Sequence, residues 1–103
     1  MKFLMKVGIP TVSGNKAMRN GNMLKQIQSY LKEVRPEAAY FSIECGKRTM
    51  FLIVDVPSAE KMPEIAEPLW LDFEAEVFVT PIMDVMEFEK AGPGIQRVLK
   101  ERM

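Results

Sequence analysis

The segment Thr49–Val56 constrains the fold most, because both alternating sets of its side chains are apolar. One set is Met50, Leu52, Val54 and Val56, and the other includes Phe51 and Ile53. A strand of this kind needs an apolar cover on both faces. Gly46-Lys47-Arg48 and an extended run at 39–45 precede it, which predicts a β-hairpin.

The chain before the hairpin predicts one strand and one helix. Residues 2–9 alternate between apolar and polar side chains, and Pro10 ends this strand. Residues 11–21 are a polar connection with a short helical turn at 15–20. Apolar residues then recur at helical spacing after Asn22, a plausible N-cap, and the helix should end before Pro36.

The chain after the hairpin predicts a second helix and a last strand. Ser58 is the expected N-cap of the helix, and Pro63 and Pro68 are expected to divide it into short pieces. Residues 75–88 form a long extended run, in which Pro81 indicates an edge strand or a bulge. Gly92-Pro93-Gly94 leads into a short final helix.

This order of strand, helix, strand, strand, helix and strand predicts an α+β, ferredoxin-like domain: a four-stranded antiparallel sheet with both helices on one face. The first and third strands would be central. The domain is expected at residues 1–90, with a C-terminal helical extension at 91–103.

Strand alternation divides the side chains between two sheet faces. The expected helix-facing set is Phe3, Met5, Val7, Phe41, Ile43, Cys45, Met50, Leu52, Val54, Val77 and Val79. The other face would carry Leu4, Lys6, Tyr40, Ser42, Glu44, Phe51, Ile53, Asp55, Phe78 and Ile82. That second face is too apolar for open water and too polar for a dry core. We therefore expect a homodimer that packs sheet on sheet around a partly polar cavity, in which Lys6, Glu44 and Asp55 pair.

Composition excludes several classes of function. The 14 basic and 14 acidic residues balance, so nucleic-acid binding is not expected. Histidine is absent, which removes His-based triads and zinc sites, and we expect no metal and no cofactor. Cys45 is the only cysteine; we expect it to be a buried apolar group in a cytoplasmic protein. Neither a signal peptide nor a membrane span is expected.

The chain resembles the dimeric α/β-barrel superfamily, and within it small bacterial members of unassigned function. The matching segments are Gly14–Gly21, Gly46–Thr49 with Val54-Asp55, Ile65–Pro68 and Ala91–Gly94. The resemblance implies a homodimer whose two sheets face each other, with a pocket between each sheet and its helices or loops. The superfamily includes cofactor-independent monooxygenases, isomerases and haem-degrading enzymes, so the fold alone selects no reaction.

Six residues are candidates for ligand binding: Tyr40, Arg48, Glu44, Arg19, Asp55 and Lys6. Tyr40 or Glu44 could exchange a proton with a ligand, although cross-strand ion pairing explains the charged group on that face better. Either arginine could hold a carboxylate through two hydrogen bonds, or remain a solvated loop cation.

Three further residues have ordinary structural explanations. Asn15 is expected to cap the local turn rather than orient a ligand. Glu67, close to Trp70, could act as an acid or base, but we favour an exposed helix residue beside a core tryptophan.

Two hypotheses follow. In the first, the homodimer binds or transforms a small, partly apolar organic acid or aromatic compound in a pocket over the sheet. In the second, it is a non-enzymatic interaction or regulatory module. A cavity of roughly 300 Å³ lined by the candidate side chains favours the first. A tightly packed interface with paired charges favours the second.

Overall fold

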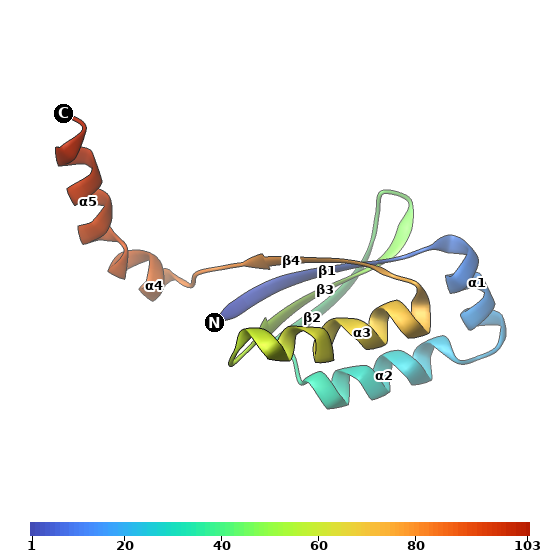
Figure 1. The fold of residues 1–103 in the computed structure, drawn as a ribbon. Coiled ribbons are helices and arrows are strands. Elements are labelled where there is room, and N and C mark those ends of the chain that lie inside the picture. The colour runs from blue at the N-terminus through green and yellow to red at the C-terminus, as the bar shows by residue number, and fades with distance from the viewer.

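Four antiparallel strands form the body of the molecule in the order β2-β3-β1-β4 (Figure 1). The structure is a computed structural model that describes residues 1–103. The strands are β1 (Lys2–Ile9), β2 (Ala38–Glu44), β3 (Lys47–Asp55) and β4 (Glu76–Pro81). The predicted α+β class and antiparallel sheet, with the first and third strands central, are confirmed. The strand order is compatible with a ferredoxin-like fold.

The helices of the body lie along one side and at one end of the sheet (Figure 1). They are α1 (Thr11–Arg19), α2 (Met23–Val34) and α3 (Met62–Phe73), the last preceded by the 3₁₀ turn η1 (Ala59–Lys61). Two more helices, α4 (Val85–Lys90) and α5 (Gly92–Glu101), follow β4. None of the helices has both the length and the apolar character needed to cross a bilayer.

The core lies between the helices and the sheet. Its strand residues are Met5, Val7, Ile9, Met50, Leu52 and Val54, with Val56 just after β3, and its helix residues are Met23, Tyr30, Leu69 and Phe73. One of the two apolar faces of β3 is therefore buried within the chain. The opposite side of the sheet, which we call the open face, carries Leu4, Lys6, Tyr40, Phe51, Ile53 and Phe78.

The connection after β1 is a nine-residue helix rather than a polar loop with a short turn. Tertiary contacts hold α1 in place. The Ser13 hydroxyl donates a hydrogen bond to the carbonyl of Phe73 at 2.7 Å, and Gly14 is buried where a Cβ would lie 3.2 Å from Ile9. That Cβ would also lie 2.8 Å from the Arg48 guanidinium, so a larger residue at position 14 would have to displace Arg48 and press on Ile9.

The second predicted helix is not divided by its prolines. α3 runs unbroken from Met62 to Phe73, with Pro63 in the first turn, where a missing N–H costs no hydrogen bond. Pro68 lies inside the helix, and burial of Leu69 and Phe73 outweighs its cost. Ser58 is the N-cap of η1, which continues directly into α3, so it begins the helical segment as predicted, although its side chain makes no capping hydrogen bond.

The last strand is shorter than predicted, because residues 85–88 belong to α4. The Asp84 carboxylate accepts a hydrogen bond from the Glu87 backbone N–H at 2.8 Å, and the Glu87 side chain accepts one from the Asp84 N–H at 3.2 Å. This reciprocal capping box begins a helix in a segment whose apolar residues had suggested a strand. Pro81 stands at the end of the edge strand β4.

The far end of β2 is less covered than predicted. Phe41 pairs with the buried Met50 and therefore lies on the helix side, yet Phe41 is 58% and Ile43 is 80% exposed. Cys45 is exposed, which contradicts its predicted burial. It occupies the hairpin turn with Gly46, at φ values of 52° and 74°, as two-residue hairpins require.

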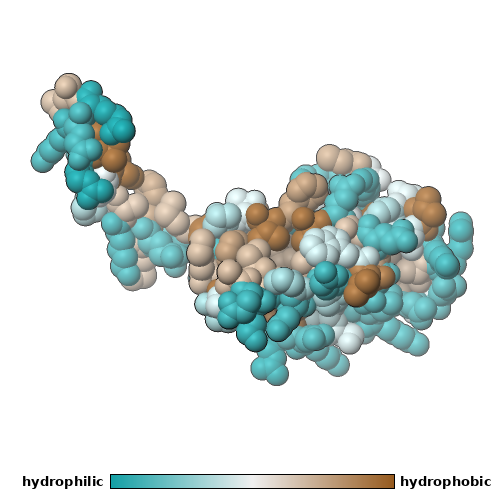
Figure 2. All heavy atoms as spheres, viewed as in Figure 1, coloured by the Kyte–Doolittle hydropathy of each residue, from teal (hydrophilic) through white to brown (hydrophobic).

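The C-terminal helices extend away from the body (Figure 1). We call residues 85–103 the arm. Neither α4 nor α5 contains a buried residue. The radius of gyration is 17.4 Å, against roughly 13 Å for a compact chain of this length. Figure 2 shows apolar atoms both on the arm and across the visible surface of the body.

Candidate functional site

The open face contains a small polar hollow of about 110 Å³ near the β2–β3 turn. Side chains of all four strands and the turn line it. The lining residues are Lys6, Gly8, Glu44, Cys45, Lys47, Thr49, Glu76 and Phe78. We call this site the polar hollow. It brings together two of the predicted ligand-binding residues, Lys6 and Glu44.

Lys6 is the central charge of the open face. Its Nζ donates a hydrogen bond to Glu44 Oε1 at 2.9 Å and lies 5.1 Å from the centre of the Phe78 ring. The hydrogen bond with Glu44 raises the pKa of the Lys6 ammonium above its usual value. Lys6 therefore stays charged at neutral pH, and Glu44 already occupies one of its hydrogen-bonding directions.

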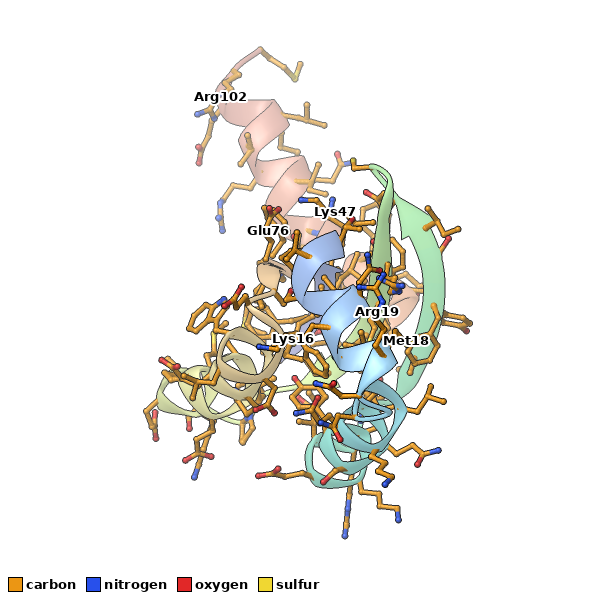
Figure 3. The ribbon with its side chains drawn as sticks, turned by 90° about the vertical axis from the view of Figure 1, so that its right-hand side faces the viewer. Lys16, Met18, Arg19, Lys47, Glu76 and Arg102 are labelled. Atoms are coloured by element: carbon orange, nitrogen blue, oxygen red, sulfur yellow. The ribbon has the colours of Figure 1, made fainter.

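A second ion pair crosses the same hollow. Lys47 on β3 and Glu76 on β4 approach to 2.9 Å, on either side of Gly8 in β1. Figure 3 labels both side chains. Because Gly8 has no side chain, the Lys47 chain passes over it, 4.0 Å from the position of a glycine Cβ. The hollow thus contains two cations and two carboxylates in matched pairs.

Two other candidates share the open face but lie outside the hollow. Tyr40 pairs with Phe51 on the edge strand β2 and is 66% exposed. Asp55 is at the opposite end of β3, where its carboxylate binds the Met1 amine at 2.9 Å. The predicted pairing of Lys6 with Glu44 is thus confirmed, whereas Asp55 has a different partner.

The two candidate arginines belong to the helix side of the sheet. Arg48 Nη2 donates a hydrogen bond to Asn15 Oδ1 at 3.1 Å, so Asn15 orients this side chain rather than capping the turn. Arg19 is exposed in the last turn of α1, where Figure 3 labels it near Met18. Neither arginine lines the polar hollow.

Sequence patterns did not reveal the remaining residues of the hollow. Lys47 belonged to the predicted turn, and Glu76 stood at the start of an extended run without special chemistry. The signal lies in the register: Gly8 pairs with Thr49 on one side and Glu76 on the other. Only strand pairing shows that Gly8 lies beside Glu76, so that the Lys47 side chain can reach across the glycine to this carboxylate.

A larger, apolar cleft lies on the other side of the sheet, against α3. Its volume is about 270 Å³, and nine of its eleven lining residues are hydrophobic. The lining includes Met62, Ile65, Glu67, Trp70, Val77 and Val79. We call it the α3 cleft. Trp70 is 44% exposed at its edge, which corrects the predicted core position of this residue.

No group of three potential metal-ligating side chains lies close enough together to hold a metal ion. Comparison of the chain with known proteins adds no identification: no protein-family model matches, and no curated protein or solved structure matches either.

Proposed function

We propose that two copies of this chain pack through their open faces, as in a dimeric α/β barrel, and that the homodimer serves as a binding module. The observation that carries the proposal is the pairing of charges within each open face. Lys6 pairs with Glu44 and Lys47 with Glu76, each at 2.9 Å. Covering the face therefore leaves no charge of the hollow without a partner, which avoids the cost of burying an unpaired charge.

The apolar residues of the open face supply the driving force. Phe78 is 50% exposed and Tyr40 is 66% exposed, and Leu4, Phe51 and Ile53 are only half-buried. These residues surround Lys6 on all four strands. Aromatic side chains are enriched in protein interfaces, where each buries a large area.

Sedimentation equilibrium between about 1 and 100 µM tests the association. The wild-type chain should be a dimer, and Phe78→Glu combined with Tyr40→Glu should weaken dimerisation at least about ten-fold, because each change places an unpaired carboxylate in the interface. Val12→Glu is the matched control, since Val12 is 84% exposed on α1, away from the open face. A monomeric wild type, or equal weakening by the control, contradicts the proposal.

A second candidate function is binding of a small organic acid with an aromatic or apolar part. The polar hollow favours it, because the Lys6 ammonium lies 5.1 Å from the centre of the Phe78 ring and Lys47 lines the same hollow. A ligand carboxylate would replace Glu44 or Glu76 as the partner of a lysine, and its apolar part would contact the ring.

A thermal-shift screen with benzoate and related aromatic acids tests this candidate. A ligand at 100 times its Kd stabilises the folded state by about 2.7 kcal/mol. Lys6→Met should abolish the shift, whereas Lys16→Met, a change at an exposed lysine on α1, should not. Absence of any shift, or an unchanged shift in Lys6→Met, would exclude the polar hollow as the site for these acids.

A further inference from the structure

We propose that the arm of each chain docks in the α3 cleft of a second copy, so that the two chains exchange their C-terminal helices. The inference rests on the proposed homodimer and adds a second contact surface to it. The arm and the α3 cleft are each incomplete within one chain, and each matches the other in apolar character and in charge.

The arm has an apolar side without a partner. Ile95, Val98 and Leu99 recur at helical spacing on α5, and they are 46%, 42% and 54% exposed. An isolated helix of ten residues is only marginally stable in water and usually depends on tertiary packing. The apolar side of α5 therefore needs a surface to cover it.

The residues between β4 and α4 set the direction of the arm and point it toward a second copy. The Ile82 N–H donates a hydrogen bond to the carbonyl of Lys2 at 3.0 Å, and Lys2 Nζ lies 3.9 Å from the Asp84 carboxylate. Beyond this anchor, α5 rises on the side of the sheet opposite to α2 and α3 (Figure 1). A second copy packed on the open face would lie beside the arm.

The arm is long enough to reach the helices of that copy. Sheets pack about 10 Å apart, and a helix layer lies about 10 Å beyond a sheet, so the second copy's helices would be about 20 Å away. The ten residues of α5 span about 15 Å at 1.5 Å per residue, and the six of α4 add about 9 Å.

Charge makes the α3 cleft the matching surface. Helix α3 carries Glu64, Glu67 and Asp72 and no basic residue, and Glu67 lines the cleft. On the arm, Arg97 lines a shallow hollow together with Ile95, Val98 and Leu99. Arg102 follows Val98 by four residues, on the same side of the helix, and its guanidinium donates to the Val98 carbonyl. Opposite charges would therefore flank matching apolar surfaces.

Interface area also favours a second contact. Four strands of about eight residues present a flat face of roughly 500 Å², from strand spacings near 4.8 Å and 3.3 Å per residue. Stable protein interfaces bury about 800 Å² on each partner. Docking of the arm would bury further surface on each partner.

Charge reversal in full-length chains tests the exchange. The first variant carries Arg97→Glu and Arg102→Glu, and the second carries Glu64→Lys and Glu67→Lys. Each alone should dimerise at least about ten-fold more weakly than wild type, because charges of the same sign would meet where each arm docks along α3. Mixed together, the two variants should form the heterodimer in large excess over the statistical half, since both contacts become complementary. Native mass spectrometry measures the proportions.

The proportion of heterodimer in the mixture distinguishes exchange of the arms from the alternatives. An arm that folded onto its own α3 would give the statistical proportion of heterodimer, and so would an arm that bound an unrelated protein; either result overturns the inference. Lys25→Glu with Lys32→Glu on α2 is the control, expected to leave dimerisation unchanged. A monomeric wild type would refute both the homodimer and the exchange. A wild-type dimer with statistical mixing refutes the exchange alone.

Discussion

At the scale of single residues, Tyr30 joins two helices across the core. It is 5% exposed on α2, and its hydroxyl donates a hydrogen bond to the carbonyl of Ile65 on α3 at 2.7 Å. Burial raises the pKa of the Tyr30 phenol well above its ordinary value. The folded protein therefore resists deprotonation at a pH where the unfolded chain ionises freely.

Tyr30→Phe should lower the free energy of unfolding by about 1 kcal/mol at pH 7, because it removes the hydrogen bond to Ile65. Because the pKa of Tyr30 is higher in the folded than in the unfolded state, the protonated phenol stabilises the folded protein at pH values below the unfolded pKa, which is about 10 for tyrosine. This stabilisation is lost as the pH rises above that value. The difference between wild type and variant should therefore narrow between pH 9 and 11. Urea unfolding at pH 9 and at pH 11 measures this difference in the free energy of unfolding.

Two features make the comparison of wild type with Tyr30→Phe specific to the Tyr30 phenol. Glu37 and Glu44 raise the pKa values of Lys2 and Lys6, but these lysines titrate alike in both proteins and their effects cancel. Ser13→Ala is the matched control, because it removes a comparable hydrogen bond, to the carbonyl of Phe73, but no titratable group. A constant difference between wild type and Tyr30→Phe from pH 9 to 11 would contradict burial as the source of the pKa shift.

At the scale of elements, local capping decides whether residues 85–90 form a helix. α4 has only six residues and buries none of them, so packing within the chain supplies little stability. The hydrogen bonds between Asp84 and Glu87 satisfy backbone groups at its first turn. The arm therefore begins at a capping box that residues close together in the sequence form.

Asp84→Ala should cost the helix about 1 kcal/mol, since alanine cannot accept the Glu87 N–H. The Cα chemical shifts of residues 85–90 should move toward random-coil values, whereas Asp84→Asn should retain them. The urea midpoint of the sheet should stay unchanged at a fixed protein concentration that maintains the same assembly. Helical shifts that persist in Asp84→Ala would show that something other than the cap maintains α4.

At the scale of the whole molecule, one chain combines a packed body with an exposed arm. The molecule extends 60 Å along its longest axis and only 27 and 20 Å along the others. Apolar side chains are exposed on both the arm and the open face, including Phe78, Phe88 and Leu99. Two separate exposed apolar surfaces are typical of a chain that binds another protein chain.

Limited trypsin digestion should cut the arm before the strands. Lys90 and Arg97 lie in helices with no buried residue, whereas strands β1 and β3 are central in the sheet. If the arm docks on a second copy, cleavage at these two sites should slow as protein concentration rises through the dimerisation range. Mass spectrometry of the fragments follows both effects, with cleavage after Arg19 on exposed α1 as the internal control. Strand cleavage before arm cleavage would refute the prediction.

The sheet and its two principal helices were predictable from local sequence patterns, because alternation and helical spacing involve only neighbouring residues. The two apolar faces of 49–56 identified a central strand, and Pro81 identified an edge. Tertiary structure decided what depends on neighbours distant in the sequence. It made α1 a helix through Ser13 and Gly14, left Phe41 and Ile43 uncovered, and kept α3 whole across Pro68.

The same division applies to the candidate site. Alternation placed Lys6 and Glu44 on one face, and their ion pair was predicted from it. The polar hollow required the register that sets Gly8 between Thr49 and Glu76, and the separation of Arg48 and Arg19 from that hollow required the position of α1. Side-chain periodicity assigns a residue to a face, but only strand pairing and helix packing determine which residues meet on it.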